Sequence, residues 1–160
     1  MLRLDSMDDE AFRAFLERAV PRRAERSVRR GIWLADRALE TSRREYAALF
    51  AQGRQTPNHH FFDVVETASG ATVGEAWYEA VESGGKVQFW IQWIAIWPEF
   101  QRRGYGRELL RLLEAEARSL GAERTILIVW TDNPGALALY TKVGYAPTNQ
   151  CMTKAIDGTA

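Results

Sequence analysis

The chain of 160 residues has few of the side chains that make cross-links or metal sites. Its single cysteine, Cys151, has no partner for a disulfide within the chain, which suits a reducing compartment such as the cytoplasm. Its two histidines are the neighbours His59 and His60, and neighbouring side chains of an extended segment point to opposite faces. With no further histidine to complete a set of ligands, we expect no metal site.

The chain also has no excess of charge and no long apolar run. Its 21 basic and 21 acidic side chains cancel, so no overall field favours nucleic acid or an acidic membrane as a partner. No stretch approaches the about 20 consecutive apolar residues of a membrane span. The length suits one domain over residues 1–160. We therefore expect one cytoplasmic domain in which any anion site is local.

Positive charge does gather in one segment near the N-terminus. Five arginines follow helical spacing there: Arg22, Arg23, Arg26, Arg29 and Arg30. Such a stripe is usually a solvated helix face, and Glu25 interrupts this one, but it would also suit an acidic substrate or RNA. The RNA interpretation is the weaker, because the net charge is zero and the strands lack a clear basic and aromatic face.

The hydrophobic patterns predict an α/β protein with a mixed sheet of about six to seven strands and helices on both faces. Helical periodicity covers the first third, with a break at Pro21 between two helices and Gly31 as a candidate interruption of the second. Three strands rich in aromatic and β-branched residues follow, the last of them a central strand at 87–97 that is apolar on both faces. The remaining predicted elements are a leucine-patterned helix after Gly104, a strand at 123–130, a helix after Asn133, and short strands near 145–148 and 151–156.

The turn before the leucine-patterned helix has the features of an anion site. Its sequence is QRRGYG, from Gln101 to Gly106. The first N–H groups of a helix lack internal partners and the peptide dipoles favour negative charge there, so a phosphate fits this position. The two glycines let oxygen atoms approach the backbone. A glycine pair alone is common at ordinary helix starts, and this one is neither a Walker loop nor a dinucleotide fingerprint.

A second distinctive segment, NPGALALYTKVGY, follows about 30 residues later. Asn133 suits the N-cap of a helix and Pro134 its first position. Tyr140 shares one helix face with Ala136 and Leu139, which places its phenol among core contacts. A buried tyrosine hydroxyl normally has a partner, although an ordinary core tyrosine would explain this segment if it stood alone.

Together the two segments resemble the GNAT acetyltransferase superfamily. The QRRGYG turn is similar to its Q/R-x-x-G-x-G/A pyrophosphate motif, and residues 133–145 are similar to its later signature, N-x-x-A-x-x-L-Y-x-K-x-G-[FY]. The resemblance implies a GNAT-like fold, acetyl-CoA as the donor and an amine as the acceptor, and it suggests a homodimer through the C-terminal strands. It also implies a splay between the central strand (87–97) and the strand at 123–130, and often a bulge that reverses the alternation of faces along the central strand.

The resemblance further assigns residues to the cofactor. Backbone amides would hold the pyrophosphate at Gln101, Arg102, Arg103, Gly104, Tyr105, Gly106 and Arg107. The edge of the central strand would pair with the pantetheine arm at Ile94, Ala95 and Ile96. Asn133 and Ala136 would lie beside the pantetheine, and Tyr140 near its sulfur.

Proton transfers then assign two catalytic roles. A departing thiolate whose thiol has a pKa of ~8.5 can take a proton from a phenol of pKa ~10, so we expect Tyr140 to be the general acid. The attacking amine must be neutral, which calls for a base acting directly or through water. Some family members carry a glutamate on the central strand, but here the nearest carboxylates are Glu75 and Glu79 on the preceding strand. Glu75 is our hypothesis for the base, against the alternative of a solvated strand residue.

The sequence leaves two questions undecided: which amine is the acceptor, and whether the protein catalyses a reaction at all. Candidates for the acceptor are a protein N-terminus or lysine, a polyamine, an aminoglycoside or another small amine. Trp77, Trp90 and Trp93 would line an apolar pocket that attracts an ammonium through cation–π contacts. The alternative to an enzyme is a non-catalytic acyl-CoA-binding or sensing domain, which the lack of a carboxylate on the central strand favours.

Overall fold

The computed structural model describes residues 1–154, which divide into two compact units at Ile128/Val129. The first unit contains a five-stranded sheet in the order β1-β2-β3-β4-β5, in which only β5 runs parallel to its neighbour. The strands are β1 (Leu2–Ser6), β2 (His59–Glu66), β3 (Thr72–Ser83), β4 (Lys86–Ile96) and β5 (Thr125–Leu127). The helices are α1 (Asp9–Arg29), α2 (Ala35–Leu49) and α3 (Tyr105–Ser119), with short 3₁₀ turns η1 (Gly53–Gln55) and η2 (Pro98–Phe100). The second unit contains α4 (Pro134–Lys142).

The mixed α/β sheet is confirmed, but the expected number of about six to seven strands is wrong for the part of the chain that is described. Residues 145–154 after α4 form no strand. Short alternating segments such as YAPT are stable as strands only when a neighbour pairs with them, and no pairing is present here. The end of the last predicted strand, residues 155–156, lies outside the described residues. The single-domain expectation stays a prediction.

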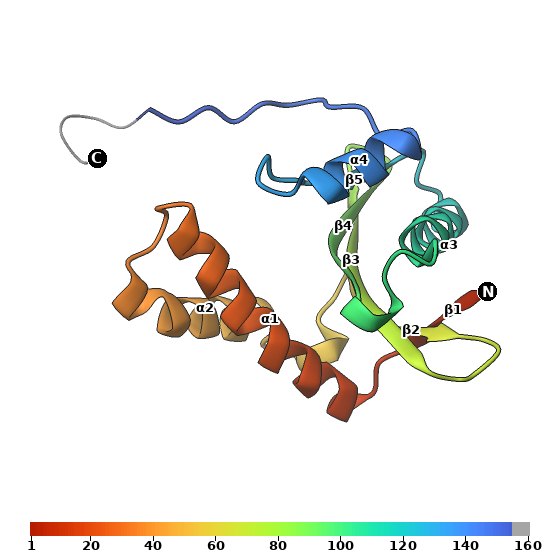
Figure 1. Cartoon of the computed structure of the whole chain (residues 1–160), viewed down its shortest axis with the longest axis horizontal. Helices are drawn as coiled ribbons and strands as arrows, with labels where there is room; N and C mark the ends of the chain where they lie inside the picture. The colour runs from red at the N-terminus through yellow and green to blue at the C-terminus, as the bar shows by residue number, and fades with distance from the viewer. Residues whose placement is uncertain (155–160) are drawn as a thin grey trace. The chain divides into compact units, whose positions relative to one another are not determined.

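Helices cover both faces of this sheet, as predicted (Figure 1). On one face α1 and α2 close over an aromatic cluster of nearly buried rings, which includes Phe15, Phe50, Trp77 and Trp93. On the other face lies α3, whose leucines Leu109, Leu110 and Leu113 are buried. The two histidines follow the alternation of β2: the His59 ring lies in the aromatic cluster, and the His60 ring stacks on Tyr78 on the face that α3 covers.

A β-bulge divides β4 into two parts. Trp77 of β3 lies opposite Trp93, but the next residue, Tyr78, lies opposite Ile91, so that Gln92 is an additional residue in β4. Ile91 and Trp93 would share a face in a regular strand, yet Trp93 lies among the rings under α1 while Ile91 lies opposite Tyr78. The reversal of faces beyond a bulge, which the resemblance implied, is therefore present.

The predicted break at Pro21 is wrong, because α1 continues through this proline to Arg29. Proline removes one internal hydrogen bond, but buried side chains on both sides of it, such as Ala19 and Ala24, keep the helix packed on its neighbours. The helix ends instead before Gly31, which has a φ of 68°. No helix among residues 1–154 is both long and apolar enough to span a bilayer.

Candidate active site

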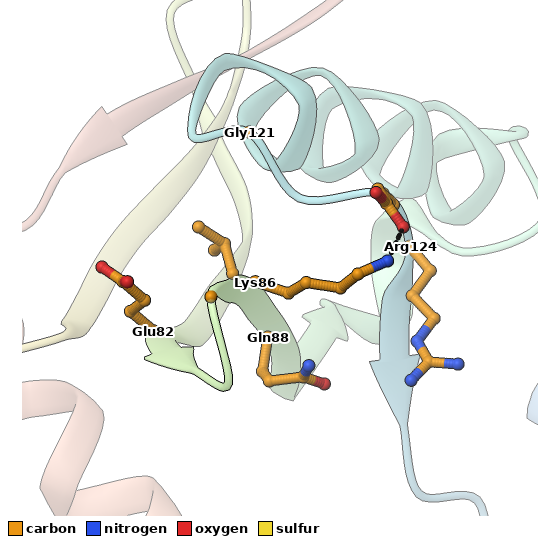
Figure 2. A pocket seen from close by; sticks show the side chains of 8 residues that line it. Glu82, Lys86, Gln88, Gly121 and Arg124 are labelled. Atoms are coloured by element: carbon orange, nitrogen blue, oxygen red, sulfur yellow. Dashed lines mark hydrogen bonds and ion pairs between the residues drawn. The ribbon is translucent and has the colours of Figure 1, made fainter.

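A pocket of about 540 Å³ opens at the start of β4, where Lys86 and Gln88 face the loop before β5 (Figure 2). Lys86 Nζ and Glu123 Oε2 form an ion pair there, 2.7 Å apart. None of the residues predicted to bind the cofactor lines this pocket. Those in the first unit lie at the other end of β4 and in the turn that follows it.

The predicted pyrophosphate turn connects β4 to α3, with η2 between them. Gln101 folds back so that its Nε2 donates to the carbonyl of Ile96 at 2.9 Å. Arg102 and Gly104 have φ values of 63° and 87°, and Gly104 is the N-cap of α3. The left-handed conformation at Gly104 explains the glycine, because a side chain would be strained there.

Several amides of this turn are free to meet a ligand. Within residues 1–154, the N–H groups of Arg102 to Gly106 donate to no protein acceptor, whereas Arg107 N donates to the carbonyl of Gly104 at 3.1 Å. These groups precede or open α3, where the helix dipole favours an anion. The guanidinium of Arg103 is held by the carbonyl of Glu99 at 2.9 Å and lies 5.3 Å from the centre of the Phe100 ring. The turn is thus suited to a phosphate or diphosphate.

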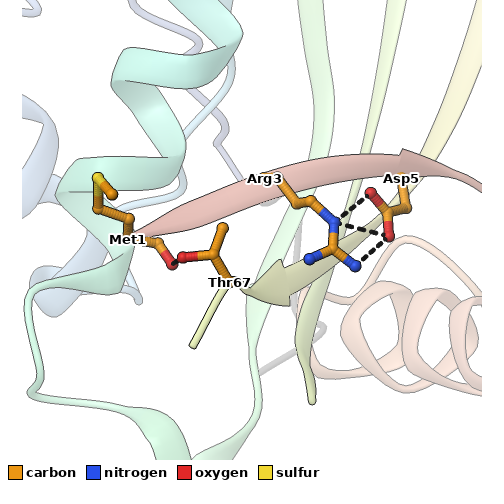
Figure 3. A network of polar contacts seen from close by, with 4 residues as sticks. All are labelled: Met1, Arg3, Asp5 and Thr67. Carbon is orange, nitrogen blue, oxygen red and sulfur yellow. Dashed lines mark hydrogen bonds and ion pairs between the residues drawn. The ribbon is translucent and has the colours of Figure 1, made fainter. Parts of the chain in front are cut away.

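Polar contacts fasten the start of α3 to the edge of the sheet. Glu108 Oε1 accepts a hydrogen bond from Leu2 N at 2.6 Å, and Tyr105 Oη donates to Glu66. The β1 end is itself tied down, since the carbonyl of Met1 accepts from both N and Oγ1 of Thr67, while Arg3 pairs with Asp5 (Figure 3). The free amides therefore belong to a rigidly attached helix end.

The second half of β4 lacks a strand neighbour on one side. Pairing with β5 covers only Phe89 to Ile91, so that residues 93–96 pair with β3 alone among the described residues. Trp97 N donates to the carbonyl of Val73 at 2.8 Å, which means that the main-chain groups of Ala95 also face β3 and those of Ile94 and Ile96 face the open edge. An extended molecule could add to this edge as a further strand would.

Gly74 lets β3 approach this half of β4 closely. A Cβ atom at Gly74 would lie 2.1 Å from the carbonyl oxygen of Ala95, a distance that the two backbones could not tolerate. The glycine thus fixes the position of the strand at Ala95 and, with it, the neighbouring open edge.

Glu75, the predicted base, lies on β3 opposite Ala95 and only 1% of its side chain is exposed. Its Oε2 accepts from Arg18 Nη2 at 2.7 Å and its Oε1 from the indole of Trp93 at 2.9 Å. Burial raises the pKa of Glu75 above its usual value, although Arg18 and Trp93 both favour the ionised form. The alternative of a solvated strand residue is wrong. Glu79 takes a different place, since it accepts a hydrogen bond from the bulge residue Gln92 at 3.0 Å.

Arginines of α1 lie over Trp93 of β4 and over Trp97, which directly follows β4. The guanidinium carbons of Arg22 and Arg26 lie 5.0 and 5.6 Å from the centre of the Trp93 ring. Arg18 lies 5.1 Å from the centre of the Trp97 ring. At Trp93, for which the sequence predicted a contact with the ammonium of an acceptor, the cations over the ring are therefore the chain's own arginines.

In the second unit, Asn133 is the N-cap of α4 as predicted, and its Oδ1 accepts from Ala136 N at 3.1 Å. The cap occupies the side-chain oxygen and leaves the Nδ2 group as a donor. Tyr140 is half-buried, and its ring centre lies 5.7 Å from that of Tyr145. Burial, followed by the charge of Tyr145, raises the pKa of the Tyr140 phenol.

The structure thus brings together the strand edge at 94–96, the turn at 101–107 and Glu75 within the first unit, and it places Asn133, Ala136 and Tyr140 together on α4. The resemblance missed Arg18, whose contact with Glu75 joins residues 57 positions apart. The available signal was the spacing of four residues from Arg18 through Arg22 to Arg26, which puts the three on one face of a helix.

Comparison with known proteins yields one family and several close relatives. The model of the acetyltransferase (GNAT) family matches residues 22–145. The Bacillus subtilis protein YdgE, described as an uncharacterized N-acetyltransferase, is 32% identical over 94% of this chain and 96% of its own length. The crystal structure of the putative acetyltransferase YycN from Bacillus subtilis is 28% identical, with a TM-score of 0.90 over 98% of this chain and 99% of that one. The N-alpha-acetyltransferase RimI of Mycobacterium tuberculosis is 36% identical over 61% of this chain and 59% of its own.

Proposed function

Because the chain belongs to the acetyltransferase (GNAT) family and is an N-acetyltransferase, we propose that it transfers the acetyl group of acetyl-CoA to a primary amine. The observation that carries the choice of donor is the turn from Arg102 to Gly106, whose amides have no acceptor among residues 1–154. Acetyl-CoA offers a diphosphate for such a group of amides and an extended pantetheine arm for a free strand edge.

The donor would bind along two adjacent segments. The diphosphate would accept from the amides of residues 102–106, with positive charge from Arg102, Arg103 and Arg107 nearby. The pantetheine arm would run along β4 and hydrogen-bond to the outward main-chain groups of Ile94 and Ile96, flanking Ala95. The early end of the β4–β5 pairing, at Ile91 and Leu127, supports a splay of these strands that admits the arm. Asn133 and Ala136 would contact the arm from α4.

In the transfer step, the amine nitrogen would attack the thioester carbonyl directly and form the C–N bond of a tetrahedral intermediate, from which the C–S bond then breaks. The departing sulfur needs a proton as its charge develops, and Tyr140 would supply it. The raised pKa of Tyr140 keeps its phenol protonated at neutral pH, as a general acid requires. As the amide forms, the nitrogen loses one N–H proton to solvent, and the tyrosinate regains a proton from solvent, so the proton that the sulfur gains is balanced by the one that the nitrogen loses.

Glu75 would act as the base that takes the proton of the arriving ammonium. Its carboxylate is buried, so a water molecule would carry the proton to it. Oε2 accepts from both Nε and Nη2 of Arg18, whereas Oε1 accepts from the Trp93 indole alone and retains a second lone pair for such a water. The raised pKa of Glu75 brings it closer to neutral pH, where a base is most effective.

A non-catalytic acyl-CoA-binding domain is the competing function, and the engagement of both Glu75 oxygens favours it. The two are separated by following free thiol released from acetyl-CoA in the presence of primary amines, including peptide N-termini, polyamines and amino acids. We expect at least one amine to raise the thiol release well above the rate of hydrolysis, in proportion to enzyme concentration. Tight binding of acetyl-CoA without release by any amine would identify a binding domain.

A further inference from the structure

Arg22 and Arg26 of α1 have no acidic partner among residues 1–154, although the nearby Arg18 and Arg23 each have one. Arg18 pairs with Glu75 at 2.7 Å, and Arg23 pairs with Glu45. Arg22 and Arg26, which lie between and beyond them on the helix, form no ion pair and no hydrogen bond to a carboxylate within residues 1–154. The positive charge next to the Trp93 ring is therefore not paired with a carboxylate among the described residues.

The two unpaired guanidiniums converge on one ring. Both lie within 5.6 Å of the centre of the Trp93 indole, and this ring is only 7% exposed. The positive charge of Arg22 disfavours that of Arg26, and contact with a single ring offsets only part of this repulsion. A planar or tetrahedral anion that accepts hydrogen bonds from both guanidiniums would supply the negative charge that the protein itself does not supply there.

Arg26 carries a second sign of an absent partner. Its Nε is buried and has no hydrogen-bond partner among the described residues, which is uncommon for a buried donor. Burial, followed by the positive charges of Arg22 and Arg30, lowers the pKa of Arg26. Both observations indicate that a negatively charged neighbour would stabilise the guanidinium of Arg26.

The place of this pair relates it to the proposed reaction. Trp93 directly precedes Ile94 on β4, where the pantetheine arm would begin to pair, and its indole nitrogen donates to Glu75, the proposed base. An anion on Arg22 and Arg26 would thus lie beside the segment at which the amine has to arrive. The chain's own arginines also occupy the ring that an ammonium would otherwise approach.

We propose that Arg22 and Arg26, seated on Trp93, bind an anionic group of the acceptor, so that the natural acceptor is an amine that also carries a carboxylate or a phosphate. The inference rests on the proposed transfer to an amine and adds the charge class of the acceptor. It assigns to the arginine pair a role in selecting the acceptor and none in binding acetyl-CoA.

The test compares amines that differ in the anionic group. One pair is γ-aminobutyrate and its amide, and the other is phosphoethanolamine and ethanolamine, so that the two arms separate a carboxylate from a phosphate. Binding to the protein is measured by titration followed by NMR, and transfer by thiol release from acetyl-CoA. The variants are Arg22→Gln with Arg26→Gln, and Arg29→Gln as a control with the same charge change on an exposed part of α1.

We expect the anionic member of at least one pair to bind at least about tenfold more tightly than the neutral one. The double variant should lose this preference and keep its affinity for acetyl-CoA, while Arg29→Gln keeps both. Equal binding of both members of each pair, or a preference that survives in the double variant, would overturn the inference. A preference for anions without any acetyl transfer would instead count against the proposed function.

Discussion

The turn at 101–107 and the α1-covered face of β4 adjoin the same half of one strand, but they are built in different ways. The turn offers main-chain N–H groups at a helix end, and its side chains serve mainly to hold its shape, as Gln101 does by donating to the carbonyl of Ile96. The face over β4 offers side chains that are joined to one another, from Arg18 through Glu75 to Trp93.

This difference suggests that the two regions have different functions, the turn in binding the donor and the α1-covered face in selecting the acceptor. A site made of main-chain amides recognises a group common to all acyl-CoA molecules, and it depends on backbone conformation more than on side-chain identity. A site made of connected side chains can change its specificity by substitution of a single residue. We therefore expect variants of the turn to affect the donor, and variants of the α1-covered face to affect the acceptor and its proton.

The largest expected effect comes from Gly104→Val, which places a β-branched residue at a φ of 87°. The turn would have to change its conformation, and the free amides would no longer point to one ligand. We expect the Kd for acetyl-CoA to rise by about 100-fold or more, as measured by calorimetry.

Gly121→Val is the matched control for this variant. Gly121 follows the other end of α3, has a φ of 79°, and like Gly104 has no atom within 4 Å of an added Cβ. Both variants should lose a similar amount of stability, roughly 1–3 kcal/mol. If Gly121→Val weakened acetyl-CoA binding as much as Gly104→Val does, general loss of stability would explain the effect and the turn would not.

The next effect separates donor binding from chemistry. Tyr140→Phe removes the proposed proton donor and keeps the ring, so kcat should fall on the order of 100-fold while the Kd for acetyl-CoA changes less than about twofold. Tyr145→Phe, which alters the neighbouring ring of the same unit, should leave kcat within about threefold. A Tyr140→Phe enzyme with unchanged kcat would remove this residue from the mechanism.

The smallest effect concerns the carboxylate beneath the arginines. Glu75→Gln keeps an acceptor for the Trp93 indole but cannot take a proton, and we expect kcat/KM to fall about tenfold at neutral pH. Because the pKa of Glu75 is raised, the wild-type rate should climb with pH through a value above the usual range of glutamate, as the carboxyl ionises. The variant should lack this rise, and a pH profile identical to that of the wild type would exclude Glu75 as the base.

Local signals in the sequence were sufficient for the main-chain parts of the site. The glycine turn and the leucine pattern predicted that α3 begins near Gly104, and Asn133 followed by Pro134 predicted the start of α4. Each of these depends on a few neighbouring residues, whose backbone preferences are strong. The same reasoning failed at Pro21, where packing of α1 on both sides outweighs a lost hydrogen bond.

The side-chain parts of the site could not be predicted in the same way. The contact between Arg18 and Glu75 depends on how α1 lies on the sheet, and the place of Trp93 depends on the additional residue Gln92 in β4. A shift of one residue in register moves every side chain of a strand to the opposite face. Composition alone therefore does not predict which tryptophan contacts which arginine. The prediction of strands in residues 145–154 was wrong for a related reason, because a strand needs a pairing partner that the local sequence does not specify.

The central claim is that main-chain amides of the turn hold the diphosphate of the donor. Calorimetric titration of the wild-type protein with acetyl-CoA, dephospho-CoA and acetyl-pantetheine tests it most directly, because only the last of them lacks a diphosphate. We expect micromolar binding of the first two and binding at least about 100-fold weaker for acetyl-pantetheine. Equal affinity for all three, or no binding of acetyl-CoA, would contradict the claim.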